Sequence, residues 1–193
     1  MSSVLQTLPT ARLFTVDEYY RMSDLGILSP EERTELIDGE VIAMAAQNPP
    51  HVTTTKLGYD YLADLLTQKA VVRCQAPIWI SDRCLPEPDI AIVRPPIERY
   101  YDRHPESEDV FWMIDVSDAT LQSHLNTKAK LYAKAGIPSY WVIDAVVREV
   151  YTHRTACEGD YRDKITMRES YVPLYLASLE VSIDLARFFP TNS

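Results

Sequence analysis

The amino-acid sequence predicts a mixed α/β (α+β) fold, in which helices and strands share one core. Segments with helical spacing and segments with strand-like patterning follow one another along the chain, and two of the strand-like segments are nearly continuous apolar runs. Such runs are typical of central strands that are buried on both faces of a sheet. Because strands and helices mix within 193 residues, we expect a single domain over residues 1–193.

The first predicted elements are a short helix and a hairpin. Thr15 followed by Glu18 forms a capping-box pattern, which predicts a helix through about Met22. Apolar and β-branched residues at 36–42 flank an Asp-Gly pair, the pair that is preferred in a two-residue type I′ turn, so this segment predicts a β-hairpin. We expect this hairpin and the strands of the C-terminal segment to add to the central sheet.

The middle of the chain predicts a helix, three strands, a second helix and a further strand. Apolar residues at helical spacing follow an Asn-Pro-Pro breaker and predict a helix from about His51 to Gln68. The second helix covers 120–135 and is stopped by the glycine and proline that follow it. Strands are predicted at 71–80, 88–93, 110–116 and 139–144, further strands at 146–153 and 161–181, and a last helical turn at 184–189.

The composition excludes several classes of protein. The net charge of −9 argues against a broad basic face for nucleic acid, so any contact with DNA would be local, assisted by a metal ion or made by an oligomer. No stretch approaches the ~20 apolar residues that span a bilayer, and the three cysteines form no C-x-x-C pair. We therefore expect no membrane segment, no disulfide framework, no zinc site and a cytoplasmic location.

Two aspartates lie at the ends of predicted strands. Asp89 follows Pro88 at the start of a short strand, and Asp115 lies at the end of the most apolar strand. A charge at the end of a buried strand is costly unless it is paired or bound to a cation. Two such carboxylates on neighbouring strand ends would form a hard-oxygen site suited to Mg²⁺. The alternative is that each aspartate caps a turn or the following helix.

One lysine of the second long helix is placed to reach inward. At ~100° per residue, Lys128 falls on the apolar stripe that Leu121, Leu125 and Tyr132 form, and this stripe should face the sheet. The other two lysines of the helix fall on the opposite face. Lys128 would either extend along the stripe to water or direct its ammonium group at the two aspartates.

Several ordered blocks of the sequence resemble one known family. The blocks are Glu-Leu-Ile-Asp-Gly-Glu at 35–40, His51, Pro-Glu-Pro-Asp-Ile-Ala-Ile-Val at 86–93, Ile-Asp-Val-Ser-Asp at 114–118, the segment 128–138, and Tyr-Trp-Val-Ile-Asp at 140–144. Over residues 15–161 the chain resembles the Uma-type restriction endonuclease family, formerly a domain of unknown function. This family belongs to the restriction-endonuclease-like PD-(D/E)XK superfamily.

The resemblance implies a fold and a set of site residues. The implied restriction-endonuclease-like core has the order helix, three strands, helix, strand, covers about 34–153, and carries an added N-terminal hairpin and C-terminal strands. Asp89 matches the first metal carboxylate, and Asp115 takes the place of the second acidic residue, which is more often Glu in this family. Ser117 stands where the superfamily has its signature lysine, and Lys128 matches the family's lysine on the following helix. The helical stripe indicates the same lysine independently.

Further residues have two interpretations each. Where the family often has Asp-Arg, this chain has His124 followed by leucine; the histidine could modulate the lysine, but we favour a plain helix-edge histidine. Glu40 could approach the metal site or be a solvated hairpin residue. His51 could contact phosphate or have the structural role that we favour. The basic and aromatic loop at 99–103 could contact nucleic acid or be simply solvated.

Together these observations predict a metal-dependent endonuclease that hydrolyses DNA. Asp89, Asp115 and the backbone carbonyl of Val116 would hold Mg²⁺ or Mn²⁺, which polarises the phosphate and lowers the pKa of a bound water. Lys128 would orient that water and offset charge on the phosphoryl oxygens. The apolar C-terminal segment at 171–189 would form the interface of a homodimer. The alternatives are a binding or assembly module on a weakened nuclease fold, and a metal-dependent hydrolase that acts on another substrate.

Overall fold

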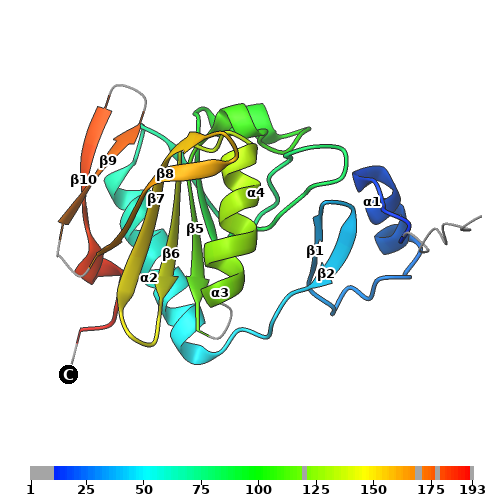
Figure 1. Cartoon of the computed structure of the whole chain (residues 1–193), viewed down its shortest axis with the longest axis horizontal. Helices are drawn as coiled ribbons and strands as arrows, with labels where there is room; N and C mark the ends of the chain where they lie inside the picture. Colours follow the sequence, from blue (N-terminus) through cyan, green and yellow to red (C-terminus); the bar gives the residue numbers. More distant parts are fainter. Residues whose placement is uncertain (1–10, 119–120, 168–170, 177–178, 192–193) are drawn as a thin grey trace, which may run out of the picture.

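A six-stranded mixed sheet forms the centre of the protein. The computed structural model describes residues 11–118, 121–167, 171–176 and 179–191 (Figure 1). The strand order is β3-β4-β5-β6-β7-β8, with β5 and β6 parallel and all other neighbours antiparallel. These strands are β3 (Val71–Cys74), β4 (Ile90–Val93), β5 (Val110–Ser117), β6 (Ser139–Asp144), β7 (Glu149–Cys157) and β8 (Asp160–Met167).

Helices cover both faces of this sheet (Figure 1). From α2 to β6 the order is helix, three strands, helix, strand, as the sequence predicts. The second helix is interrupted by a π-helical segment, which the sequence analysis did not predict. The helices are α1 (Val16–Asp24), α2 (Pro49–Leu65), α3 (Leu121–Ser123), the π-helical segment (His124–Lys128) and α4 (Ala129–Lys134), with short 3₁₀ turns at Ile97–Tyr100, Ser107–Asp109 and Leu185–Phe188.

Side chains of the central strands alternate between the two helical layers. In β4, Ile90 and Ile92 pack with α2, whereas Ala91 and Val93 pack with α4. Both faces of the sheet are therefore buried, which explains why the central strands are apolar runs without polar alternation. Of the helices within the described residues, none combines the length and the apolar character needed to cross a membrane.

The strand predicted at 71–80 is shorter than expected. β3 ends at Cys74 because Gln75 has a φ of +46°, in the left-handed region, and Pro77 follows two residues later. The backbone N–H of Gln75 still donates to the carbonyl of Asp89 at 3.0 Å. The early end of β3 therefore leaves Gln75 beside the residue that precedes β4.

Two hairpins flank the central sheet without joining it. Asp38 and Gly39 both have positive φ angles, as the predicted type I′ turn requires. The last two strands form a second hairpin. Within the described residues each hairpin is a separate two-stranded sheet, so the expectation that these strands extend the central sheet is wrong for both hairpins. It is confirmed for β8, which covers the start of the predicted 161–181 segment and is the last strand of the central sheet. The hairpin strands are β1 (Thr34–Ile37) with β2 (Glu40–Ala43), and β9 (Tyr171–Leu176) with β10 (Leu179–Asp184).

Much of the apolar C-terminal segment belongs to the protein's own core. Val172, Ile183 and Phe188 are fully buried and pack in the cluster on the α2 side of the sheet. Tyr171 and Tyr175 are exposed, at 63% and 59%. This packing explains part of the apolar composition that suggested an interface, and the homodimer stays a prediction.

Gly58 lies in α2, against the ring of Phe188. A Cβ atom at this position would lie 2.5 and 2.7 Å from two ring carbons of that fully buried side chain. Since overpacking a core costs about 1–3 kcal/mol, Gly58→Ala is expected to lower the free energy of unfolding by this amount, measured by urea denaturation. Phe188→Leu should lower the free energy of unfolding less in the Gly58→Ala background than in the wild type, because the smaller side chain relieves the clash. Strictly additive losses would contradict the steric explanation.

Candidate active site

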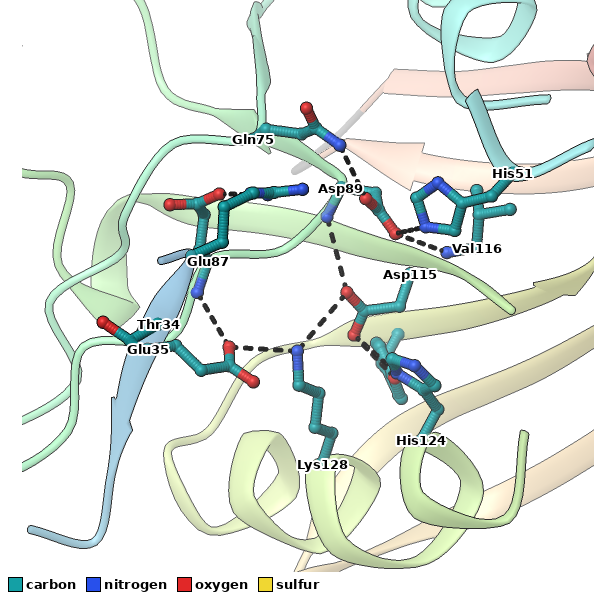
Figure 2. A network of polar contacts seen from close by, with 12 residues as sticks. Thr34, Glu35, His51, Gln75, Glu87, Asp89, Asp115, Val116, His124 and Lys128 are labelled. Carbon is teal, nitrogen blue, oxygen red and sulfur yellow. Dashed lines mark hydrogen bonds and ion pairs between the residues drawn. The ribbon is translucent and has the colours of Figure 1, made fainter. Parts of the chain in front are cut away.

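The two predicted aspartates lie side by side, where β4 begins and β5 ends (Figure 2). β4 and β5 are antiparallel, and Ile90 pairs with Ile114. Asp89, which precedes Ile90, therefore lies next to Asp115, which follows Ile114. The backbone N–H of Asp89 donates to Oδ1 of Asp115 at 3.4 Å. Both side chains are buried, at 5% and 1% exposure. The register of one strand pair therefore brings together two carboxylates that are 26 residues apart in the chain.

Three donors fix the carboxylate of Asp89. Its Oδ2 accepts from the backbone N–H of Val116 at 2.8 Å and lies 3.1 Å from Nε2 of His51, while its Oδ1 accepts from the amide of Gln75 at 3.1 Å. His51 lies in the first turn of α2, where Asn48 caps the helix by accepting from its backbone N–H. Burial lowers the pKa of His51, but the hydrogen bond to Asp89 and the negative charge of Asp89 outweigh it and raise the pKa overall.

Lys128 lies between two buried carboxylates. Its Nζ is 3.7 Å from Oδ1 of Asp115 and 3.1 Å from Oε2 of Glu35, and Figure 2 shows the side chain rising from its helix toward both. Burial lowers the pKa of Lys128, but the charges of Asp115 and Glu35 outweigh it and raise the pKa. The side chain of Lys128 therefore points inward, as the helical spacing predicts.

The second carboxylate oxygen of Asp115 has its own partners. Oδ2 accepts from the hydroxyl of Tyr140 at 2.8 Å and lies 3.4 Å from Nδ1 of His124. Burial alone would raise the pKa of Asp115. The Lys128 ammonium, with His124 and Tyr140, holds that pKa well below its usual range. At neutral pH the pair Asp115 and Lys128 is therefore a buried ion pair.

The contact between His124 and Asp115 contradicts the helix-edge interpretation of this histidine. His124 opens the π-helical segment and Lys128 closes it. A π-helix bonds i to i+5, so it turns by less than 100° per residue. Relative to an uninterrupted α-helix, this rotates His124 from the edge of the inward stripe toward its middle. Nothing in the residue pattern indicates the π-helical segment, which explains why the pattern favoured the helix edge over a role for His124 beside the lysine.

The hairpin contributes Glu35 rather than Glu40. Glu35 is buried in β1, where its Oε2 also accepts from the backbone N–H of Glu87 at 3.1 Å. Glu40 is exposed on β2, which agrees with the solvated interpretation. The contact of Glu35 with Lys128 was not predicted, although Glu35 opens the first family-like block. Strand alternation puts Glu35 on the opposite face from the core residue Leu36, which by itself predicts an exposed glutamate, so it gave no signal for the buried contact with Lys128.

A cavity of about 150 Å³ lies over these groups. Glu35, His51, Asp89, His124 and Lys128 are among the residues that line it. The space can hold several waters, or a cation with part of its hydration shell, because one water takes about 30 Å³ in the liquid. Within the described ranges, no cluster of three or more His, Cys, Asp or Glu side chains has the arrangement of a metal site. Asp89 and Val116 line the cavity, whereas Asp115 lies behind its wall, so a cation here would meet Asp89, backbone oxygen and water first.

The loop at 99–103 lies outside this site. Arg99 and Arg103 form ion pairs with the buried Asp109, at 3.1 and 2.7 Å. Ser117 is fully buried at the end of β5. Of the residues predicted for chemistry, Asp89, Asp115 and Lys128 come together, and His51, His124, Glu35, Gln75 and Tyr140 join them.

Comparisons with known proteins agree with this fold. A solved structure of "a putative nuclease belonging to DUF820" from Anabaena variabilis ATCC 29413 is similar, with a TM-score of 0.67 and 16% sequence identity over 91% of this chain and 97% of that chain. At this identity the likeness shows a shared fold, and the predicted restriction-endonuclease-like fold is confirmed. A comparison with curated proteins found no match. The model of the Uma2 family, described as "Putative restriction endonuclease", matches residues 16–186, so this chain belongs to the Uma2 family.

Proposed function

We propose that this protein is a metal-dependent endonuclease that hydrolyses phosphodiester bonds in DNA. The observation that supports this proposal best is the convergence of Asp89, Asp115 and Lys128 at adjacent strand ends, beside a cavity. The two carboxylates could hold a divalent cation, and the lysine could offset the negative charge that builds up on the phosphoryl oxygens during hydrolysis. Membership in a family described as restriction endonucleases supports the same reaction class.

The donor atoms fit a hard divalent cation. Asp89, Asp115 and the backbone carbonyl of Val116 would hold Mg²⁺ or Mn²⁺, because these ions prefer oxygen ligands. An ionised carboxylate has about four lone-pair sites, and Oδ1 of Asp89 accepts one hydrogen bond, from Gln75. The metal would supply Lewis-acid polarisation of the phosphate and a bound water of lowered pKa.

The surrounding residues would position the reacting groups. Lys128 would offset the charge that develops on the phosphoryl oxygens, and Glu35 would hold the lysine chain in that position. His51 and Tyr140 fix the orientation of the two aspartates through their hydrogen bonds. These groups are rigid parts of α2, β6 and the hairpin, so the site is organised before substrate arrives.

One observation favours a second candidate, a binding or assembly module on a nuclease fold. Both oxygens of Asp115 already have partners in Lys128, Tyr140 and His124, so a cation would have to share or displace them. The net charge of −9 also opposes tight binding to a polyanion without metal. This candidate predicts nucleic-acid or protein binding without hydrolysis at any metal concentration.

The test is a plasmid-nicking assay across a titration of Mg²⁺ or Mn²⁺. Supercoiled DNA should convert to nicked and then linear forms with metal, and EDTA should stop the conversion. A labelled single strand and an RNA strand in parallel reactions would give the substrate class. Intact DNA at every metal concentration, from protein that is folded by circular dichroism, would overturn the proposal and favour the binding module.

A further inference from the structure

A second cavity lies away from the candidate active site. It measures about 620 Å³ and lies between α1, β3 and the loop that connects β4 to β5. Its lining is mostly aromatic and basic, in contrast to the acidic balance of the chain. We call it the aromatic pocket, and its main residues are Tyr20, Arg73, Trp79, Tyr100, Tyr101 and His104.

Arg73 is the cation of the aromatic pocket that lacks a counter-charge. Its Nε is buried without a hydrogen-bond partner, and no carboxylate of the described residues forms an ion pair with its guanidinium. Arg103, on the same pocket wall, is by contrast bound to Asp109 at 2.7 Å. Half-burying a cation without an anion is costly, so an anion bound at Arg73 would be stabilised.

The same pocket offers flat aromatic surfaces. The guanidinium groups of Arg73 and Arg103 both lie over the ring of Tyr100, with their Cζ atoms 5.9 and 5.4 Å from its centroid. The side chain of Tyr101 is 95% exposed, and the ring of Tyr20 stacks on that of His104 with an interplanar angle of 15°. Aromatic and guanidinium planes of this kind stack on nucleic-acid bases, whatever the base.

Two acidic residues limit what the aromatic pocket can hold. Asp102 and Glu106 also line it, and both are exposed. They would repel a long polyanion that ran through the pocket, whereas one phosphate next to Arg73 would avoid them. The burial of His104 and the charge of Arg73 lower the pKa of this histidine, so it adds no positive charge at neutral pH. The chemistry therefore fits one phosphate with one planar base.

We propose that the aromatic pocket binds a single unpaired nucleotide of a nucleic-acid strand, with its phosphate at Arg73 and its base on the exposed tyrosines. The role as a substrate contact rests on the proposed nuclease function. Arg73 lies two residues before Gln75, whose amide donates to Asp89, so a short piece of chain joins the pocket to the candidate active site. An unpaired base is required because the stack of a duplex covers the ring faces that the tyrosines would contact.

Intrinsic fluorescence can report on this pocket directly. Of the three tryptophans, Trp112 and Trp141 are fully buried in the core, whereas Trp79 lines the aromatic pocket. Adding an oligothymidylate of about ten nucleotides in EDTA, where no cleavage occurs, should quench the fluorescence of the wild type. Trp79→Phe should remove this response. A quench that persists in Trp79→Phe, or no quench in the wild type, would overturn the proposal.

Affinity for a labelled oligothymidylate, measured by anisotropy in EDTA, tests the two contacts. Arg73→Ala and Tyr101→Ala should each weaken binding by about tenfold, the size expected for one phosphate contact or one stacked base. The matched control is Arg187→Ala, since Arg187 also lies over a tyrosine ring, at 5.0 Å from the centroid of Tyr61, but neither residue lines the aromatic pocket. It should bind as the wild type does. The same strand annealed to its complement should bind more weakly.

Cleavage assays on the same variants separate this proposal from the proposed function. If the wild type cuts DNA and Arg73→Ala binds the oligothymidylate as tightly as the wild type, the pocket proposal is wrong and the nuclease proposal stands. If the strand binds at Trp79 but no nucleic acid is cut, the nuclease proposal fails and the pocket proposal stands. Because Tyr101 is exposed, its variant keeps the test informative even if Arg73→Ala unfolds.

Discussion

Asp89→Asn is expected to reduce metal-dependent cleavage of DNA by at least about 100-fold while the protein stays folded. The asparagine keeps the size of the side chain but removes the negative charge that a divalent cation needs. It also presents an amide nitrogen where a carboxylate oxygen stood. Calorimetric titration with Mn²⁺ should show weakened binding in the same variant, which ties the lost activity to the metal.

The hydrogen bonds around Asp89 make this variant a clean test. Oδ2 of Asp89 accepts from the backbone N–H of Val116 and contacts Nε2 of His51, so the oxygen of the new asparagine amide should take the position of Oδ2. The new NH₂ group then faces the side chain of Gln75, which can turn its own amide and accept. We therefore expect the thermal midpoint of Asp89→Asn to stay within a few degrees of the wild type.

The matched control for this variant is another strand-end aspartate. Asp184 ends β10 and caps a 3₁₀ turn by accepting from the backbone N–H of Ala186, which is the structural role considered as the alternative for Asp89. Asparagine is an equally good cap, so Asp184→Asn should cleave as the wild type does. Equal cleavage by Asp89→Asn and Asp184→Asn would show that Asp89 holds no catalytic metal.

The sequence predicts a residue's position where a pattern within one helix or strand determines it, but not where packing between separate elements does. The lengths of the apolar runs placed Asp89 and Asp115 at strand ends, and helical spacing alone directed Lys128 inward. The contact with Glu35 could not be predicted in this way, because it depends on how a separate hairpin docks against the helix. The role of His124 depends on a π-helical segment that has no sequence signal. The left-handed φ of Gln75, which ends β3 early, was equally invisible, since the apolar pattern continues beyond it.

Lys128→Met is expected to have the largest effect on stability. Methionine fills a similar volume but leaves the buried carboxylates of Asp115 and Glu35 without their cation. Removing one partner of a buried ion pair costs about 3–5 kcal/mol. For a protein of this size that is a fall in the thermal midpoint of roughly 6–20 °C. Cleavage should fall by about 100- to 1000-fold, because the ammonium group that would offset charge on the phosphoryl oxygens is lost.

Two further variants identify the cause of that loss. Lys130→Met changes an exposed lysine of the same helix and should shift the free energy of unfolding by less than about 0.5 kcal/mol. Glu35→Gln combined with Lys128→Met removes one of the two unpaired charges, so it should be more stable than Lys128→Met alone. If the double variant lost as much free energy of unfolding as the two single variants together, the unpaired charges would not be the cause.

A divalent cation should partly replace the missing ammonium group in Lys128→Met. The two carboxylates that Lys128 contacts would then be free to bind Mg²⁺, and binding to the folded state raises its stability. Millimolar Mg²⁺ should therefore raise the thermal midpoint of Lys128→Met more than that of the wild type, while cleavage stays low because the lysine is still absent. Equal stabilisation of both proteins would mean that the lysine and the metal occupy separate positions, with Lys128 serving the phosphate alone.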